Sequence, residues 1–413
     1  MLSWRDGTLG QMHQQPRFPL FRLLVLTGAI FVSVSSEFLP TGLLPDMADD
    51  LRVSESRVGL LVTIFAFTVA ATAAPLAVVT QRFSRKWLMV VLLLVFGVTN
   101  VLAGIAPTYE FLVGARVLGG LAHGLFWAVT GPYASRLVPR TQLVRALSVT
   151  NAGGTAAFIL GIPLGTALGH ALGWRFAFLM MAGIVLVFTA LVVVFLPPVE
   201  HRHTLTTGEI GLPYYRDRTI PAVVAACILT VLIMLGHNTF NTYVAPWIVD
   251  VAAFSPDSVA LLLFVSGTAG ALGLFLAGVF GDRYPRATFA ILLGLVGVAV
   301  ALLAGFAGPH WFVIGLFFVW GAAFGGLPSL LHGRVLGVAS ARIRDVASAA
   351  LTTSFNIAIG GGALLGGILL DAFGIANVPW AYVALVIAAL AFVIISDLRH
   401  PRRHSIQETS GVR

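Results

Sequence analysis

The chain has 413 residues, of which 58% are hydrophobic and only 10% charged, and its mean hydropathy is +0.94. A soluble protein carries about 25% charged residues, so this composition excludes a soluble globular fold and indicates a polytopic membrane protein. The formal net charge of +8 does not indicate a nucleic-acid partner, because the basic residues lie between apolar segments along the whole chain.

Apolar runs long enough to cross a hydrocarbon core of ~30 Å as helices recur from end to end. The sequence predicts twelve spans, at about 18–45, 57–80, 87–106, 110–135, 143–169, 174–197, 219–249, 257–280, 287–307, 311–336, 343–370 and 378–398. The first run is too long for the apolar region of a signal peptide and lacks a small-residue cleavage site, so we expect a retained span. The one cysteine, Cys227, lies within a span, which excludes a disulfide within the chain.

The basic residues are distributed unequally between the two sides of the predicted bundle. With the N-terminus in the cytoplasm, the outer loops hold only Arg52, Arg57 and Arg175 of the 25 Lys and Arg residues. The positive-inside rule therefore predicts that both termini are cytoplasmic. We expect a multi-pass protein of the cell inner membrane or plasma membrane, with lipid headgroups as partners of its basic residues.

The spans divide into two halves of six that resemble each other. We expect an N-terminal six-helix half at 1–197, a cytoplasmic linker at 198–218, a C-terminal six-helix half at 219–398 and a cytoplasmic tail at 399–413. A constant offset of 201 residues pairs identical residues of the two halves: Pro45 with Pro246, Gly120 with Gly321, Gly124 with Gly325, Gly161 with Gly362 and Gly173 with Gly374. Parallel six-span repeats are typical of transporters that rock about a midplane site.

Four stretches carry a resemblance to a known family. They are SSEFLPTGLLPDMADDL at 35–51, ARVLGGLAHGLFWAV at 115–129, GIPLGTALGHALGWRFAF at 161–178 and SFNIAIGGGALLGG at 354–367. With them the chain resembles the major facilitator superfamily, and within it the twelve-span drug:proton antiporter branch that includes bacterial sugar and arabinose efflux permeases. The resemblance covers nearly the whole chain and implies an all-α fold of twelve membrane helices that transports by alternating access.

The superfamily's cytoplasmic gate motif, roughly G-x-x-x-D-R-x-G-R, follows the second span of each half. The C-terminal copy keeps Gly278, Asp282, Arg283 and Arg286, and the N-terminal copy keeps Arg82, Arg85 and Lys86 but has Ala77, Gln81 and Ser84 at the glycine, aspartate and second glycine positions. We expect Gly278 to allow a close helix approach and Asp282 to pair with an arginine such as Arg334. The alternative is that these charges only set the topology.

The fifth span resembles the antiporter motif of the same family. Gly161, Pro163 and Gly165 lie in the stretch GIPLGTALG. Small residues let membrane helices pack closely, and a proline bends a helix where neighbours satisfy the freed carbonyl. We therefore expect a tight, kinked helix contact here.

Polar residues within the spans are the candidates for transport chemistry, because a charge at membrane depth is costly and commonly functional. At ~1.5 Å per residue from the outer end of each span, Glu37 lies ~13 Å deep and Arg116 ~10 Å deep, so the two can meet across the first and fourth spans. His123, His237 and Asn356 lie ~20 Å deep on the same scale. Glu37 is the only carboxylate well inside any predicted span, so we expect it to carry protons, with Arg116 and His123 beside it.

Helical phase groups some of these residues on common faces. Arg116, Gly120, His123 and Trp127 form one stripe of the fourth span, and His237 and Asn241 lie one turn apart on the seventh. The resemblance implies that these stripes line a central cavity. The candidate substrate contacts are Phe126, Trp127, His237, Asn238, Asn241, Tyr243 and Asn356.

Each candidate also has a plainer interpretation. Glu37 can reach headgroups near the outer interface, and Arg116 can hold two helices together. A histidine or asparagine in a bundle often only forms a hydrogen bond between helices. His123 or His237, with an unperturbed pKa near 6.5, is the alternative proton carrier.

Other function classes lack their motifs. The only lysine, Lys86, has no phosphate-binding glycine loop around it, and no hydrolase motif is present, so we expect neither a pump driven by ATP nor an enzyme, and no cofactor or metal. The polar and aromatic residues suit neutral, hydroxyl-rich substrates. We expect a monomeric, proton-coupled efflux transporter of sugar-like or other small amphipathic solutes; a multidrug antiporter, an uncoupled facilitator or a channel are the alternatives.

Overall fold

A computed structural model describes residues 18–80, 83–198, 217–281, 283–306, 308–340 and 342–399. These residues form helices and short connections without any strand. They include twelve helices long and apolar enough to cross a membrane. The predicted all-helical fold with twelve spans is confirmed, whereas most of the predicted linker 198–218 and of the tail 399–413 lies outside the described residues.

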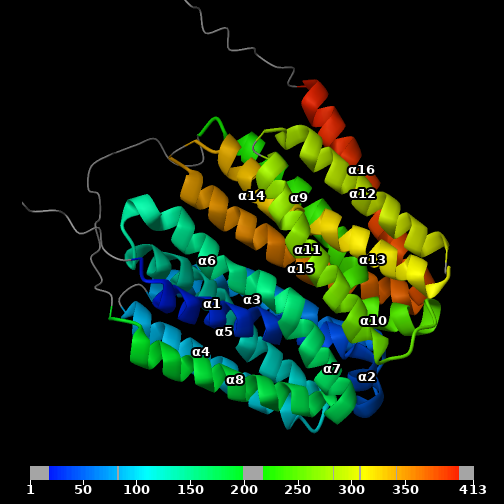
Figure 1. Ribbon diagram of the computed structural model, residues 1–413, viewed down its shortest axis with the longest axis horizontal. Coiled ribbons are helices and arrows are strands. Elements are labelled where there is room, and N and C mark those ends of the chain that lie inside the picture. The colour runs from blue at the N-terminus through cyan, green and yellow to red at the C-terminus, as the bar shows by residue number, and fades with distance from the viewer. Residues whose placement is uncertain are drawn as a thin grey trace, which may run out of the picture.

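The spans of the N-terminal half are α1 (Leu20–Gly42), α3 (Glu55–Val79), α4 (Arg85–Gly104), α5 (Tyr109–Arg136), α6 (Leu143–Ala156) with α7 (Ile162–Leu172), and α8 (Trp174–Phe195). Those of the C-terminal half are α9 (Ile220–Asn241), α11 (Ser258–Gly281), α12 (Pro285–Gly305), α13 (His310–Gly325) with α14 (Leu327–Val338), α15 (Arg344–Phe373) and α16 (Val378–Arg399). Short helices α2 (Leu44–Leu51) and α10 (Val244–Pro246) follow the first span of each half. Figure 1 shows the two halves side by side, the first in blue to green and the second in yellow-green to red.

The two halves repeat each other at the level of single contacts. A methyl group added at Gly120 would meet the carbonyl oxygen of Phe65 at 2.8 Å, and one added at Gly321 would overlap that of Ser266, which is the equivalent residue of the second half. Gly173 and Gly374 follow the fifth and eleventh spans with φ of 93° and 79°. Only glycine adopts such angles without strain. The same glycine turn therefore occurs once in each half, after equivalent spans.

Several spans are interrupted where the sequence predicts continuous helices. A π turn (η2, Ala157–Gly161) joins α6 to α7 just before Pro163. Because Pro163 has no N–H for the carbonyl of Ile159, the helix widens by one residue at this point. The tenth span breaks between α13 and α14 at Gly326, two residues before Pro328.

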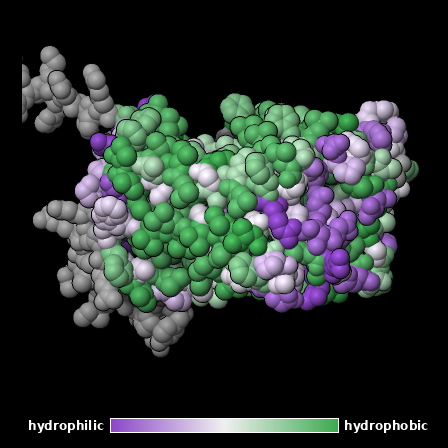
Figure 2. Space-filling view, turned by 90° about the horizontal axis from the view of Figure 1, so that it is seen from below, coloured by the Kyte–Doolittle hydropathy of each residue, from purple (hydrophilic) through white to green (hydrophobic). Residues whose placement is uncertain are grey.

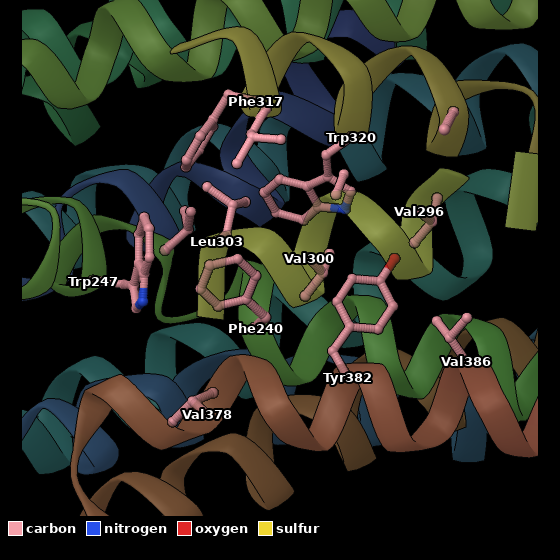
Figure 3. Packing of buried hydrophobic residues seen from close by; sticks show 14 of the residues in the cluster. Phe240, Trp247, Val296, Val300, Leu303, Phe317, Trp320, Val378, Tyr382 and Val386 are labelled. Carbon is pink, nitrogen blue, oxygen red and sulfur yellow. The ribbon is translucent and has the colours of Figure 1, made fainter. Parts of the chain in front are cut away.

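Each half has its own apolar core, and the outer surface is apolar as well. In the C-terminal half, Phe240, Trp247, Phe317, Trp320 and Tyr382 belong to one buried cluster, with the Tyr382 hydroxyl pointing toward the side occupied by Trp320 (Figure 3). Figure 2 shows a broad hydrophobic face over much of the molecule, with hydrophilic residues gathered toward one end. An apolar surface of this extent is stable against lipid chains rather than water.

The halves are joined at the end that carries α2 and α10. The Thr63 hydroxyl of α3 donates to the carbonyl of Gly360 in α15 at 2.9 Å. Tyr243 is fully buried, donates to the carbonyl of Ala363 at 2.9 Å and packs against Gly59 of the other half. These contacts close this end of the bundle, which the charge distribution predicts to be the outer one.

Candidate functional site

A proline in the first span positions the arginine of the fourth. Pro40 lies inside α1 and has no N–H, so the carbonyl of Ser36 loses its helical partner. Arg116 of α5 takes that place, donating from Nη1 to the carbonyl oxygen of Ser36 at 3.1 Å and from Nη2 to that of Glu37 at 2.8 Å. The depth estimate predicts that Arg116 and Glu37 can meet. Arg116 reaches Glu37 through the backbone carbonyl of that residue, whereas the Glu37 carboxylate contacts His123.

The Glu37 carboxylate contacts His123 on the same face of α5. Glu37 Oε2 lies 3.3 Å from His123 Nε2. The indole Nε1 of Trp127 donates to the same nitrogen at 2.8 Å, and Ser33 Oγ lies 3.0 Å from His123 Nδ1. Both ring nitrogens of His123 therefore have partners, and the ring orientation is fixed by residues from two helices.

This cluster is enclosed by aromatic rings. Glu37, Arg116 and His123 are 5%, 5% and 3% exposed. The Arg116 guanidinium lies 4.3 Å from the centre of the Phe65 ring, and the His123 ring packs edge-on against the same ring at 5.2 Å. Electrostatic interactions are stronger in such an apolar enclosure than in water, so the protonation of one member acts strongly on the others.

Ser33, Ser36 and Asn100 complete the polar cluster, and the candidate set from the sequence lacks them. With Arg116 they line a cavity of about 10 Å³, and the Ser36 hydroxyl donates to Asn100 Oδ1 at 2.9 Å. A space of this size has room for about one water molecule. The spacing of Ser33, four residues before Glu37, places both on one face of α1 and is the signal that identifies Ser33.

Phe126 and Trp127, which follow each other in α5, point to different surroundings. Phe126 is fully buried and packs against Phe96 at 5.6 Å between ring centres, inside the core of the N-terminal half. Trp127 is 37% exposed although its nitrogen bonds to buried His123. The indole of Trp127 is therefore the place where the Glu37–His123 cluster reaches the surface.

His237 and Asn238 lie within the C-terminal half. The His237 ring stacks on Phe324, with ring centres 3.4 Å apart, and its Nδ1 lies 3.4 Å from the Tyr382 hydroxyl. Asn238 is buried, donates to the carbonyl of Met234 in its own helix and faces Gly362 of α15. The structure therefore does not bring these two residues to the Glu37 cluster.

Asn241, Tyr243 and Asn356 occupy three further places. Asn241 lines a cavity of about 40 Å³ between the halves, together with Phe38 and Thr41 of α1. Tyr243 belongs to the closed end described above, and Asn356 donates to the carbonyl of Thr352 in its own helix. Of the C-terminal candidates, Asn241 is thus the one that faces residues adjoining Glu37 in the first span.

Arg82 and Asp282 of the gate motif lie outside the described residues. Lys86 donates to the carbonyl of Val193 near the end of α8 at 2.8 Å, and so satisfies one of the last carbonyls of that helix. The guanidinium of Arg283 lies 5.3 Å from the centre of the Tyr284 ring, and that of Arg334 lies 5.6 Å from the Phe289 ring. Arg85 is half-buried at the start of α4, and Arg286 is exposed in the first turn of α12.

The expectation of a close helix approach at Gly278 is wrong for this structure. A methyl group added at Gly278 would meet no atom within 4 Å. Five residues earlier in α11, a methyl group at Gly273 would overlap the backbone of Ala322 in α13. The close approach occurs there because that face of α11 meets α13, whereas Gly278 lies on another face.

The glycines of the fifth span face the first span. Methyl groups at Gly161 and Gly165 would overlap the side chains of Ser35 and Leu39. These two residues flank Glu37 in the sequence, so the glycine stripe holds α1 in place beside the cluster. Within the described residues no group of three or more His, Cys, Asp or Glu side chains is arranged to hold a metal ion.

Comparisons with known proteins agree with this architecture. The family model described as Major Facilitator Superfamily matches residues 26–225 and 226–411. A protein of Helicobacter pylori (strain G27) named probable sugar efflux transporter is 32% identical over 374 residues, which cover 91% of this chain and 94% of that protein. A protein of Mannheimia succiniciproducens with the same name is 31% identical over 381 residues, covering 91% and 93% of the two chains.

Solved structures show the same fold at lower identity. A mutant of the nucleoside transporter NupG superposes with a TM-score of 0.77 at 16% identity, covering 92% of this chain and 100% of that one. A bacterial homologue of the lysosomal transporter Spinster, in an inward-facing and occupied conformation, gives a TM-score of 0.72 at 16% identity, covering 91% and 96% of the two chains.

Proposed function

Because the chain belongs to the Major Facilitator Superfamily, and is thus a multi-pass membrane transporter rather than an enzyme, we propose that it exports small, sugar-like solutes in exchange for protons. The observation that carries the proposal is the buried contact between Glu37 and His123, 3.3 Å apart. The protein would work as a monomer, because each chain has both halves and its own Glu37–His123 cluster.

The substrate class is supported by the relatives and by the charges of the site. Relatives 31–32% identical over 91% of the chain are named probable sugar efflux transporters. Glu37 is the one carboxylate deep within a span in the described part of the chain, so no second negative charge is available for a dicationic drug. The exposed ring of Trp127 offers an aromatic face, on which the apolar side of a sugar stacks.

The hydrogen bonds of His123 support a role for the pair in carrying a proton. Because Trp127 donates to Nε2, that nitrogen is an acceptor, and the imidazole is neutral with its proton on Nδ1 toward Ser33. A charged Glu37 carboxylate beside an accepting nitrogen would be repelled at 3.3 Å. We therefore infer that the arrangement corresponds to a Glu37 that holds the proton.

Trp127 offers a physical link between solute and proton. A solute that stacks on the exposed part of the indole and turns the ring would withdraw its N–H from His123 Nε2. Nε2 would then be free to accept the proton of Glu37, and the resulting ion pair differs in charge distribution from the neutral pair. This transfer keeps the proton within the pair, so exchange also requires that the His123 imidazolium release the proton to the cytoplasmic side while the solute is bound. Glu37 must then take up a proton from outside after the solute has left.

The test uses purified protein in liposomes with an imposed pH gradient and labelled pentoses, disaccharides, a nucleoside and a lipophilic cation. Wild type is compared with Glu37→Gln and with the matched control Glu110→Gln, which changes an exposed carboxylate on the outer turn of α5. We expect gradient-driven sugar flux in wild type and in the control. Glu37→Gln should keep counterflow of the sugar but lose the drive from the gradient.

The other outcomes favour different functions. Movement of the lipophilic cation alone would replace sugar efflux by multidrug efflux. Counterflow in wild type without any response to the gradient would indicate an uncoupled facilitator, with Glu37 a structural partner of His123. Undiminished coupling in Glu37→Gln would exclude this carboxylate as the proton carrier.

A further inference from the structure

A groove separate from the Glu37 cluster lies between the helices α9, α14 and α16 of the C-terminal half. It has a volume of about 340 Å³ and is bordered by the first half of α9, the last part of α14 and Phe392 of α16. This volume lies within the range of about 300–1,000 Å³ that is typical of sites for small molecules. The groove does not contain any residue used in the proposed function.

Two arginines line the groove near the ends of their helices. Arg218 is exposed and lies two residues before α9 begins, and Arg334 is half-buried in the last turns of α14. The acid next to Arg218, Asp217, accepts hydrogen bonds from Thr219 and from the Ser340 hydroxyl at 2.6–2.8 Å. Its oxygens thus face those partners, and Arg218 and Arg334 are the two charged side chains among the described residues that line the groove.

The rest of the groove is apolar and smooth. Ala222, Ala225 and Ala226 line it from one face of α9, because their spacing of three and four residues places them together. Leu229 lies ~16 Å along the helix from Arg218 and lines the deep end, with Phe392 of α16. One wall of the groove therefore has almost no side chains that would obstruct an extended chain.

We propose that this groove binds one anionic phospholipid, with the phosphate at Arg218 and Arg334 and an acyl chain along the alanine face of α9. The end of the groove with the two arginines would hold the phosphate. The apolar end, which extends toward the membrane interior, would hold an acyl chain. Juxtamembrane Lys and Arg residues attract anionic headgroups with about 1 kcal/mol each, which corresponds to about a five-fold change in affinity. The proposal is independent of the transported solute.

The test measures the thermal unfolding midpoint and lipid retention of the full-length protein in a neutral detergent. Phosphatidylglycerol, phosphatidylcholine and inorganic phosphate are added separately, and retained lipid is counted by native mass spectrometry. The variants are Arg218→Gln with Arg334→Gln, and Ala225→Phe, which fills the groove without changing charge. Arg22→Gln at the same end of α1 and Val224→Phe at an exposed neighbouring position are the matched controls.

We expect wild type to retain one phosphatidylglycerol and to be stabilised by it in preference to phosphatidylcholine. The affinity should fall by about 25-fold in the double arginine variant, and should fall in Ala225→Phe as well, with both controls unchanged. Equal stabilisation by phosphatidylcholine or by inorganic phosphate overturns the proposal, and so does undiminished phosphatidylglycerol binding in either groove variant. If the double arginine variant does not fold, Ala225→Phe, which keeps both arginines, still tests whether the groove binds the lipid.

Discussion

At the scale of single residues, Arg116 has two roles that are difficult to separate by simple substitution. Its guanidinium supplies charge beside Glu37, and it also donates to the Ser36 carbonyl that Pro40 leaves without a partner. Loss of transport in an Arg116 variant would therefore not identify its chemical role. A change at Pro40 separates the two contributions.

We expect Arg116→Met to lower the free energy of unfolding by about 1–3 kcal/mol, since buried carbonyls lose their donor. Pro40→Ala supplies an N–H to the Ser36 carbonyl, so the same arginine substitution should cost about 0.5–1.5 kcal/mol less in that background. A double-mutant cycle in mixed detergent micelles measures this coupling. Strict additivity would show that the arginine does not serve the proline-freed carbonyl.

Trp127→Phe keeps an aromatic face but removes the N–H that bonds to His123. One hydrogen bond of about 1 kcal/mol corresponds to about a five-fold change in an equilibrium. We therefore expect sugar counterflow to persist while the number of protons moved per sugar falls, as measured by parallel sugar and pH fluxes in liposomes. Phe126→Leu is the control in the neighbouring buried position, and an equal loss of coupling there would contradict the role of the indole N–H.

The sequence identifies the charged residues of the site better than it identifies their partners. Glu37, Arg116 and His123 could be predicted because charged and titratable groups are rare within spans. Ser33 and Asn100 could not be singled out in this way, because serine and asparagine are common in membrane helices. His237 shows a second limit: helical phase groups it with Asn241, but does not reveal that its face meets Phe324 and Tyr382.

At the scale of helices, α11 contains two glycines with opposite surroundings. A methyl group at Gly273 would overlap the backbone of Ala322, and one at Gly278 would meet open space. We expect Gly273→Ala to lower the free energy of unfolding by about 1–3 kcal/mol. Gly278→Ala should be neutral or stabilising by up to ~1 kcal/mol, because alanine favours a helix more than glycine does. Equal destabilisation by both substitutions would contradict the packing described for α11.

Asp217 stabilises the start of α9 and fastens it to the segment after α14. Hydrogen bonds from Thr219 and Ser340 lower the pKa of the Asp217 carboxyl to about 2. A lowered pKa stabilises the folded state above the unfolded value of about 3.9, and this stabilisation is lost as the pH falls toward 2. Asp217→Asn should therefore unfold at a lower temperature than wild type at pH 7, and the difference should shrink between pH 4 and pH 2.

The same pH series with Asp257→Asn provides a control, because Asp257 is an exposed acid near the start of α11 at the opposite end of the molecule. A constant difference between wild type and Asp217→Asn at every pH would show that the charge of Asp217 does not contribute.

The helices were predictable to within a few residues, except that the seventh span, predicted to continue to residue 249, ends as α9 at Asn241. The interruptions of the helices were not predictable. Length and hydropathy locate a span, whereas the π turn before Pro163 and the break at Gly326 depend on how a widened or ended helix packs against its neighbours. The first span illustrates this: the apolar run continues to Pro45, yet α1 ends at Gly42 and α2 begins at Leu44. Hydropathy does not distinguish one bent helix from two.

At the scale of the whole molecule, the contacts between the halves lie toward the end that carries α2 and α10. Alternating access requires these contacts to separate when the other face closes. Thr63 and Gly360 form one of them, at 2.9 Å between hydroxyl and carbonyl oxygens. Because the chain has a single natural cysteine, Cys227, a cross-link can be introduced without competing pairs after Cys227→Ala.

In the Cys227→Ala background, we expect Thr63→Cys and Gly360→Cys to form a disulfide under oxidation. The disulfide should stop transport, and reduction of the disulfide should restore it. Each single cysteine variant is the control and should show the same transport before and after oxidation. This comparison holds even if the Gly360→Cys control transports less than wild type, because a Cβ at Gly360 would lie 2.7 Å from the Phe67 ring. Full transport by the cross-linked protein would show that this end does not open during the cycle.

The position of Glu37 as the one carboxylate deep within a span of the described chain has an electrical consequence. If one proton enters for each neutral sugar that leaves, every cycle carries one positive charge inward. A membrane potential of 100 mV then contributes about 2.3 kcal/mol per cycle, enough for roughly a 50-fold outward concentration ratio without any pH difference. Export should therefore continue when the two pH values are equal, as long as the cell interior stays negative.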